Sequence, residues 1–373
     1  MKAVAEDRKS SSPKPVVLHL VGGDNTQGGM LTYVRQLARE DLPGFEQRVW
    51  KYRGYTPENE RFLCLGKAKV LDVSILGDLG GASLDFLPLY HWLRKNRNAV
   101  LYAHNRPNAI LGAVMRHIFG VPVLVHVHTL GRKKALNRLL WRMAQATVIF
   151  NSTLSCRHFD QAIETAHVHM PTIRWPDRPD PGGGRLVACS AIQQVKNIDL
   201  IIDAFNAAGE AAPRTLHIYG LSADPFEPAY QQRIIEMARQ NPRIFLHDWD
   251  ERWTDHLGHD DIFIHARFEE PFGIVMLEAF AKGCRMVVPS DTFLNDLSHE
   301  GVFFADLTVE SLAKNLGRAN AYAPPTSLWE SRRVFQKQFS IESTCERLHA
   351  VLCAVINDNR RFTGAMELSQ KTL

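Results

Sequence analysis

The stretch 266–283, ARFEEPFGIVMLEAFAKG, decides the fold because it joins a strand to a helix through a short acidic loop. An apolar run ends where this stretch begins, and Pro271 starts a turn that leads into a helix near Gly273. Glycine lets a ligand come close to the backbone. The free amides of Phe272, Gly273 and Ile274 would form a helix N-terminus, which is a natural site for phosphate or for sugar hydroxyls.

Two carboxylates of this stretch, Glu270 and Glu278, differ in their expected surroundings. Glu270 precedes the predicted helix and Glu278 lies on its first turns, so the two should occupy different parts of one pocket. A carboxylate offers up to about four acceptor positions to sugar hydroxyls. The alternative is that the acidic loop only complements the helix dipole.

The same alternation of strand and helix runs through both halves of the chain. Short apolar runs predict strands, and longer amphipathic runs predict helices. We expect strands at 16–21, 99–104, 121–128, 146–152, 185–191, 214–220, 243–249, 261–266 and 284–290, and helices at 29–39, 109–119, 134–144, 197–208, 229–239, 272–283 and 341–357. This alternation predicts an α/β fold with two Rossmann-like, doubly wound domains facing a central cleft, where ligands bind beyond the carboxyl ends of the strands.

A segment rich in proline and glycine, PTIRWPDRPDPGGG at 171–184, divides the chain. Such a composition is typical of a linker. The sequence therefore predicts a disordered tail at 1–14, an N-terminal domain at 15–172, a linker at 173–184, a C-terminal domain at 185–338, a C-terminal helix at 339–360 that packs toward the N-terminal domain, and a tail at 361–373.

The length and composition are those of a globular protein with two domains. The chain has 373 residues, of which 45% are hydrophobic and 23% charged, and two domains of roughly 150–200 residues would account for this length. The apolar run Val16–Val21 is too short for a signal peptide. No segment reaches the ~20 apolar residues that span a bilayer. The scattered cysteines predict reduced thiols, so we expect a cytoplasmic protein.

Charge is distributed unevenly along the chain. Residues 1–175 hold 24 Lys and Arg against 13 Asp and Glu, a net charge of +11, whereas the remainder carries −7. This asymmetry predicts an anionic partner for the N-terminal half, such as a phosphorylated glycan or a membrane surface, and the alternative is a solvated basic face. Nucleic acid is not expected, because the chain lacks a helix-turn-helix signature and an aromatic RNA platform.

The segment GRKKALNRLLWRM at 131–143 is a basic amphipathic helix by its pattern. Such a helix lies on an anionic membrane or holds a phosphorylated acceptor. The alternative is a helix packed by its leucines with its basic residues in water. The candidate acceptor or membrane residues are His128, Arg132, Lys133, Lys134, Arg138 and Arg142.

His126 and His128 alternate along a predicted strand, so both point to one face. This spacing suits a metal ion, but the sequence suggests no third ligand. We therefore expect no metal site.

These segments resemble the retaining glycosyltransferases of family four, which have the GT-B fold. The Glu-x7-Glu signature at 270–278 carries the resemblance, and other segments extend it over most of the chain. Residues 28–38 resemble the family's glycine loop and first helix, 100–110 and 123–129 resemble strands that end in His, and 189–205 resembles the segment around a donor-binding Lys.

The resemblance implies a role for each matched residue. Glu278 would bind the ribose of a nucleotide, Glu270 would hold the hydroxyls of the donor sugar, and Lys196 would contact the diphosphate. The implied catalytic residues are Glu270, His104 and Lys196, with His104 near the reacting sugar. The implied donor-binding residues are Glu278, Phe272, Gly273, Ile274, Gly28, Gly29 and Lys196.

One position departs from the family's pattern. The family often has an Arg five residues before the donor-binding Lys, and this chain has Ala191 there. Arg267 or Arg132 would have to replace that cation.

The expected reaction is metal-independent transfer of a hexose, with retention, from a UDP- or GDP-linked sugar to a glycan or lipid-linked acceptor. The expected context is the synthesis of lipopolysaccharide or another cell-surface polysaccharide, with no cofactor and with peripheral contact to the inner face of the membrane. The alternatives are another GT-B enzyme, such as an epimerase or a phosphorylase, and a sugar-nucleotide-binding protein with impaired chemistry.

Overall fold

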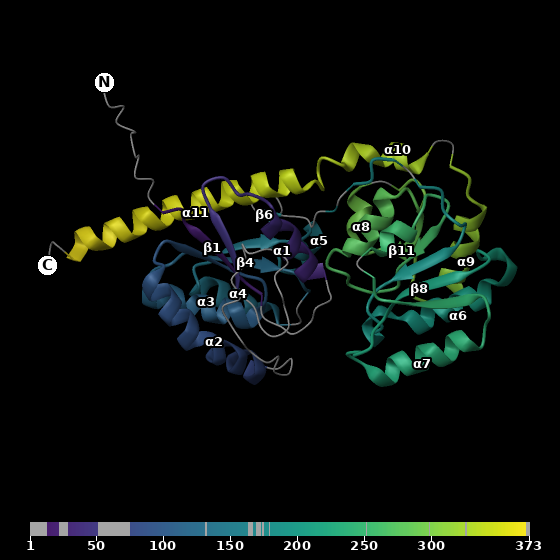
Figure 1. Cartoon of the computed structure of the whole chain (residues 1–373), viewed down its shortest axis with the longest axis horizontal. Helices are drawn as coiled ribbons and strands as arrows, with labels where there is room; N and C mark the ends of the chain where they lie inside the picture. The colour runs from purple at the N-terminus through teal and green to yellow at the C-terminus, as the bar shows by residue number, and fades with distance from the viewer. Residues whose placement is uncertain are drawn as a thin grey trace, which may run out of the picture.

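The structure is a computed structural model, and it contains two six-stranded parallel sheets flanked by helices (Figure 1). It describes residues 13–370 except 22–28, 51–74, 131–132, 163–166, 169–172, 174, 179, 251, 298 and 325–326, and it does not describe the side chains of 31, 75–78, 81, 84 and 360–370. The predicted α/β fold with two doubly wound domains is confirmed. Gly28, Arg132 and most of the predicted N-terminal tail lie outside the described residues.

The first sheet has the strand order β2-β1-β3-β4-β5-β6. The strands β1, β3 and β4 are buried along their whole length, as continuous apolar runs in a parallel sheet should be. The elements of this domain are β1 (Val16–Leu20), α1 (Gly29–Arg39), β2 (Glu46–Trp50), α2 (Ile75–Lys95), β3 (Ala99–Ala103), α3 (Arg106–Phe119), β4 (Val123–Val127), α4 (Lys134–Met143), β5 (Thr147–Phe150), α5 (Thr153–His158) and β6 (His167–Val168).

The second sheet has the order β12-β11-β10-β7-β8-β9. Its central strands β7, β10 and β11 pair side by side, so the loops after them lie close together. The elements of this domain are β7 (Leu186–Cys189), α6 (Ile198–Ala208), β8 (Leu216–Leu221), α7 (Pro228–Arg239), β9 (Ile244–Asp248), β10 (Ile262–Ile264), α8 (Ile274–Ala281), β11 (Arg285–Pro289), β12 (Val302–Ala305), α9 (Val309–Ala321) and α10 (Leu328–Arg332).

Helix α3 begins three residues before its predicted start at Ala109. The side chain of Asn105 accepts a hydrogen bond from the amide of Asn108 at 3.0 Å, and Pro107 occupies the first turn, where its missing N–H costs nothing. At the other end, Gly120 adopts the left-handed conformation with φ 67° and ends the helix.

The last helix, α11 (Ile341–Gln370), returns to the first domain, where Figure 1 shows it in yellow. Its Leu348, Val351 and Leu352 are buried in one cluster with residues of β1 and α1. The predicted end at Asn357 is wrong. The apolar periodicity stops near there, but the backbone remains helical up to Gln370.

The chain crosses between the domains at two neighbouring points. The amide of Ile173 donates to the carbonyl of Phe339 at 3.4 Å, which joins the outgoing segment to the returning one. Ile173 and Trp175 are buried against the second domain, so part of the predicted linker is packed. No helix among the described residues combines the length and the apolar character needed to cross a membrane.

Arg332 in α10 is fully buried and holds the end of α8. Its guanidinium donates to the carbonyls of Phe280 at 3.1 Å, Cys284 at 2.7 Å and Glu300 at 3.0 Å. It also lies over the ring of Phe280, 4.2 Å from the centroid. One buried side chain thus joins the last turn of α8, at Phe280, to the start of β11 and to the segment before β12.

We expect Arg332→Ala to lower the free energy of unfolding by about 3 kcal/mol or more, because it removes three buried hydrogen bonds and the contact with the ring of Phe280. Urea unfolding followed by circular dichroism measures the change. The neighbouring Arg333 is exposed, and Arg333→Ala should change the stability by only about 0.5 kcal/mol. Equal effects of the two substitutions would contradict this account of α8.

Candidate functional site

Two helix N-termini meet where the domains join. Helix α1 begins at Gly29 and α8 begins at Ile274, and a Cβ on Gly29 would lie 3.3 Å from Cδ1 of Ile274. The backbone amides at the start of a helix carry partial positive charge. The structure therefore brings two such ends together, as an anion site requires.

The loop after β5 holds the first domain against the Glu270 loop. The hydroxyl of Ser152, which is buried, donates to the carbonyl of Pro271. Beside it, Thr153 donates to the carboxylate of Asp296, and Arg157 lies 3.7 Å from the same carboxylate. These contacts fix the position of the first domain next to Glu270.

Glu270 is the centre of a charged cluster in the second domain. Its Oε2 lies 2.8 Å from Nζ of Lys196, 3.2 Å from Nε2 of His265 and 3.3 Å from the guanidinium of Arg267. Burial by itself would raise the pKa of Glu270, but the charge of Lys196, the hydrogen bond from His265 and the charge of Arg267 lower it well below the ordinary value. Glu270 is thus an ionised, oriented carboxylate although only 7% of it is exposed.

The backbone around Glu270 explains how this cluster forms. Gly273 has the left-handed φ of 77° and precedes the helix, so α8 starts at Ile274. The predicted start at Phe272 is two residues too early. A Cβ on Gly273 would lie 3.1 Å from Cγ of Glu270 and would clash with Met276. Phe272 turns its ring into the core, where it stacks on Phe293 with centroids 4.1 Å apart. Phe272 therefore offers only its backbone to a ligand.

Lys196 reaches Glu270 because its own loop is tied to the end of β10. The short 3-10 helix Gln194–Lys196 ends at Asn197, which has the left-handed φ of 51°. The amide of the Asn197 side chain donates to the carbonyl of Ala266 at 2.8 Å. The loop after β7 is thereby held against the loop that carries Glu270.

Glu278 lies within α8, away from the charged cluster. Nε1 of Trp253 donates to its Oε2 at 3.0 Å. Burial raises the pKa of Glu278 to about 7, and the hydrogen bond from Trp253 opposes this rise only in part. Glu270 and Glu278 therefore differ in charge state near neutral pH as well as in position.

The structure changes the expected part played by His104. This residue follows β3, is 2% exposed, and bonds through one ring nitrogen to His19 at 3.1 Å and through the other to His128 at 3.0 Å. The ligand atoms of His104, His126 and His128 lie within 4.8 Å of one another, an arrangement that a metal ion could use. The inference that His126 and His128 lack a third histidine is wrong, because His104 is contributed by the neighbouring strand.

Helix α4 lies on the surface of the first domain with Trp141 as its buried anchor. Its pattern predicts that leucines pack inward, but Leu139 is 54% exposed and Met143 is 49% exposed. Arg138 pairs with Asp160 at 3.4 Å. The other described basic candidates on or beside this helix form no ion pair within the described part of the chain; they are Lys133, Lys134 and Arg142.

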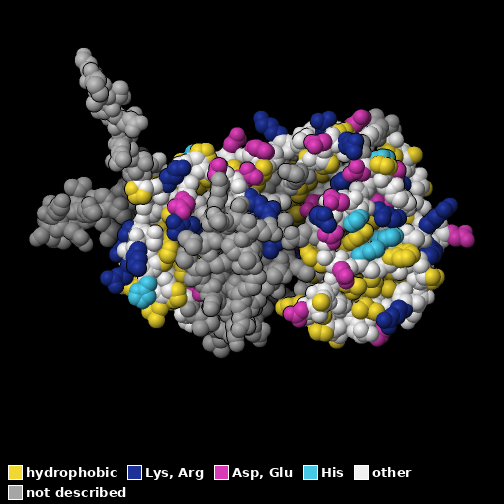
Figure 2. All heavy atoms as spheres, viewed as in Figure 1, with side chains coloured by type: hydrophobic (Ala, Val, Ile, Leu, Met, Phe, Trp, Pro, Cys, Tyr) yellow, Lys and Arg dark blue, Asp and Glu magenta, His cyan; other side chains and the backbone are white. Residues whose placement is uncertain are grey.

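Figure 2 shows basic side chains at the outer edge of the first domain, near α2, and interspersed basic and acidic side chains on the visible face of the second domain. The basic excess of the N-terminal half is thus not concentrated on α4 alone.

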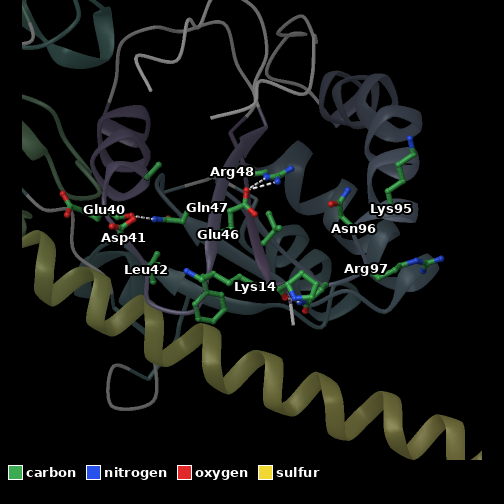
Figure 3. A pocket seen from close by; sticks show the side chains of 15 residues that line it. Lys14, Glu40, Asp41, Leu42, Glu46, Gln47, Arg48, Lys95, Asn96 and Arg97 are labelled. Carbon is green, nitrogen blue, oxygen red and sulfur yellow. Dashed lines mark hydrogen bonds and ion pairs between the residues drawn. The ribbon is translucent and has the colours of Figure 1, made fainter. Parts of the chain in front are cut away.

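A pocket of about 670 Å³ lies at the amino ends of β1 and β2 (Figure 3). Charged residues of both signs line it, among them Lys14, Glu40, Asp41, Arg48 and Arg97. The residues that line this pocket all lie between Pro13 and Asn98, in the first domain. The Glu270 loop follows β10 in the second domain, so this pocket is separate from the candidate site.

Sequence reasoning missed Trp253, His265 and Ser152. A signal existed for His265, because it ends the apolar run of β10 as His104 ends that of β3. Trp253 and Ser152 reach the site through contacts between distant segments and had no local signal.

The second domain also matches a known family. Residues 183–319 match the family model described as glycosyl transferases group 1. The matched segment runs from just before β7 into α9. It contains Lys196, Glu270 and Glu278, so the clustered residues lie inside the matched region.

Solved structures of similar fold cover nearly the whole chain. HepE from Anabaena, in complex with UDP, has a TM-score of 0.68 and 14% identity, over 91% of this chain and 99% of that one. Sucrose-phosphate synthase from Thermosynechococcus elongatus has a TM-score of 0.75 and 14% identity, over 92% and 100%. The lipopolysaccharide outer core galactosyltransferase WaaB has a TM-score of 0.63 and 12% identity, over 91% and 99%. A comparison with curated proteins finds no match.

We expect Glu278→Gln to stabilise the protein at pH 8 but not at pH 4. The folded state holds the proton of Glu278 up to a pKa of about 7, against an ordinary value of 4.5. Wild-type stability should therefore fall as the pH rises through this window, and glutamine has no proton to lose. The difference in unfolding free energy between variant and wild type should grow by on the order of 1–3 kcal/mol.

Chemical unfolding at several pH values measures this difference. The control is Glu236→Gln, which replaces an exposed carboxylate on α7. A pH-independent difference for Glu278→Gln would show that Glu278 ionises normally.

Proposed function

We propose that the chain is a retaining, metal-independent glycosyltransferase that moves a hexose from a UDP- or GDP-linked sugar to a glycan or lipid-linked acceptor. The observation that carries this proposal is the ionised Glu270 beside Lys196 and Arg267, next to the N-termini of α1 and α8. All three residues lie in the segment that matches the glycosyl transferases group 1 model. This arrangement supplies a carboxylate for sugar hydroxyls and positive charge for a diphosphate in one place.

The proposed donor spans the two carboxylates. Glu278 binds the ribose hydroxyls, and Glu270 holds the sugar hydroxyls together with the amides of Phe272 and Gly273. Lys196 contacts the diphosphate. The bond between the sugar and the diphosphate breaks in the reaction, so charge that grows on the departing phosphate is stabilised by cations and helix N-termini already in position.

Arg267 supplies the second cation that the sequence lacks at Ala191. Its guanidinium lies 3.3 Å from Glu270, on the same carboxylate oxygen as Lys196. Two cations and two helix N-termini offset a diphosphate without a bridging metal ion, which supports metal-independent transfer. Because Lys196, His265 and Arg267 already engage Glu270, it is better suited to hold the sugar than to attack it. This favours retention in which the departing phosphate takes the acceptor's proton on the same face.

The acceptor is proposed to bind the basic first domain. Similar structures include a complex of HepE with UDP-glucose and an outer core galactosyltransferase. The net charge of +11 in residues 1–175 suits an anionic glycan. We place the protein in the cytoplasm at the inner face of the membrane, in lipopolysaccharide or other surface polysaccharide synthesis. Gly29, at the start of α1, lets that helix approach the donor.

Alanine substitutions at the two carboxylates should have different effects. Glu278→Ala should weaken binding of a UDP- or GDP-linked sugar by about 10-fold or more, since it loses the carboxyl group that bonds the ribose hydroxyls. Glu270→Ala should mainly lower turnover, by about 100-fold, because its contacts orient the reacting sugar. Calorimetry and donor hydrolysis without acceptor measure the two effects.

The control for both is Glu236→Ala on α7, which should leave binding and hydrolysis unchanged. Binding of neither nucleotide sugar by the wild-type protein would overturn the proposed function. Binding without hydrolysis, even in the presence of acceptors, would favour the impaired binding protein.

Helix α4 provides the test of membrane contact. Leu139 and Met143 are exposed on the helix that also carries Lys134 and Arg142. The double substitution Leu139→Ser with Met143→Ser should reduce cosedimentation with vesicles that contain anionic lipid by about fivefold, because it removes apolar area that enters the interface. Val334→Ser, at a position 75% exposed on the second domain, is the matched control. Equal sedimentation of the two variants would contradict the membrane role of α4.

A further inference from the structure

Trp253 is a buried side chain whose polar atom meets one carboxyl group of the candidate site. It lies in the short 3-10 helix Trp253–His256, between β9 and β10, and is 2% exposed. Its Nε1 donates to Oε2 of Glu278, in α8, at 3.0 Å. A buried indole N–H costs free energy unless it meets an acceptor. The contact therefore joins the loop before β10 to the side of α8 that carries Glu278.

The surroundings of the indole fix its direction. Its ring packs against Phe263 of β10, with centroids 5.7 Å apart, and both rings belong to one buried cluster. Asp250 holds the turn before it. The carboxylate of Asp250 accepts from the amide of Arg252 at 2.8 Å, and its carbonyl accepts from the amide of Trp253 at 3.2 Å. The N–H thus approaches Glu278 along a line that the fold sets before any ligand binds.

The carboxyl group of Glu278 uses only part of its hydrogen-bonding capacity within the protein. Trp253 bonds Oε2, whereas Oε1 accepts no hydrogen bond from the described residues, and Glu278 is partly exposed. An amide side chain would satisfy the indole at lower cost, since burying a carboxylate costs more than burying an amide. Oε1 is therefore the atom of Glu278 that is available to a ligand.

The indole also determines which oxygen of Glu278 carries a proton. Burial raises the pKa of Glu278 to about 7, so its protonated and ionised forms coexist near neutral pH. An N–H donor prefers the oxygen without a hydrogen, so the proton belongs on Oε1. The nearby thiol of Cys189 stays protonated in this range, because burial and the charge of Glu278 raise its pKa well above the ordinary value. Oε1 thus donates or accepts, and a ribose hydroxyl can pair with either form.

We propose that Trp253 is a positioning residue for nucleotide binding, which holds Oε2 of Glu278 and thereby directs Oε1 to the ribose hydroxyls. This inference rests on the proposed function, because that function supplies the ribose. It adds the group that orients Glu278, and this group lies outside the Glu-x7-Glu motif. A nucleotide without ribose hydroxyls should therefore bind equally well whether or not the indole N–H is present.

Two tryptophan substitutions separate the N–H from the bulk of the indole. Trp253→Phe removes the N–H that bonds Glu278. Trp175→Phe makes the same chemical change in the same buried cluster, at a side chain that is 7% exposed. Nε1 of Trp175 has no hydrogen-bond partner among the described residues. Both variants lose part of an indole from the core, so only Trp253→Phe should change the recognition of ribose.

Calorimetry with UDP and 2′,3′-dideoxy-UDP measures that recognition, and the GDP pair replaces them if the wild type binds GDP. We expect the wild type to bind UDP about 10-fold more tightly than the dideoxy analogue. Trp253→Phe should weaken UDP binding by about 10-fold and binding of the analogue by less than about twofold, the loss of one oriented hydrogen bond. Trp175→Phe should keep the preference of the wild type. Equal losses for both ligands in Trp253→Phe would show that only packing was lost, and would overturn the inference.

The contact itself is tested without a nucleotide. ¹⁵N–¹H NMR resolves the indole N–H groups, and the resonance missing from Trp253→Phe assigns Trp253. In the wild type this resonance should shift with a midpoint near pH 7, because Nε1 bonds the carboxyl group that titrates. Glu278→Gln should abolish the shift, and the resonance of Trp175 should not follow it. A Trp253 resonance that does not change across neutral pH would contradict the inference.

Failure of the proposed function has a different signature. A wild-type protein that binds neither UDP nor GDP would overturn the function and the inference together, although the Trp253 resonance would still titrate. A wild-type protein that binds the nucleotide, but whose preference for ribose survives in Trp253→Phe, would overturn the inference alone.

Discussion

The ion pair between Lys196 and Glu270 joins the two loops on which the donor site depends. It connects the segment after β7 to the segment after β10 across 2.8 Å, and His265 and Arg267 complete the shell around the same carboxylate. Removing charges from water is costly, so such a pair persists only when its remaining hydrogen-bonding capacity is satisfied. Here the carboxylate of Glu270 has three partners before any ligand arrives. Burying this ion pair costs stability. In return, the charged groups are already in position when a ligand binds.

This cluster matters because the two domains present complementary features to it. Each domain has a parallel sheet with its loops at the carboxyl ends, and one helix from each begins at the same junction, at Gly29 and Ile274. Ser152 links the first domain to the carbonyl of Pro271, directly beside Glu270. Binding groups from both halves of the chain are therefore available to one ligand, which a single doubly wound domain would not provide.

The sequence predicts those parts of the fold that have a local cause. Strands such as β1 and β4 are continuous apolar runs, and the loop before α8 has its turn residues within a few positions. The sequence analysis does not predict the strand β2 or the helices α2 and α9. EQRVW in β2 has mixed polarity, and α2 contains Pro88, whereas α9 does carry a boundary signal in its capping residue Thr308. The candidate residues Lys196, Glu270 and Glu278 lie in local motifs. The contacts of Trp253 with Glu278 and of His19 with His104 depend on pairings between distant segments. The burial and double bonding of His104 could therefore not be foreseen from the sequence.

The double crossing between the domains has a consequence for how the chain holds together. The outgoing segment near Ile173 and the returning segment near Phe339 touch, and α11 then anchors its Leu348 and Leu352 in the core of the first domain. The C-terminal helix thus follows the second domain in the sequence but packs in the core of the first domain. A single backbone cut in either crossing would leave the two domains tethered by the other crossing. The two domains are therefore connected twice at their junction, by the outgoing segment and by the returning one.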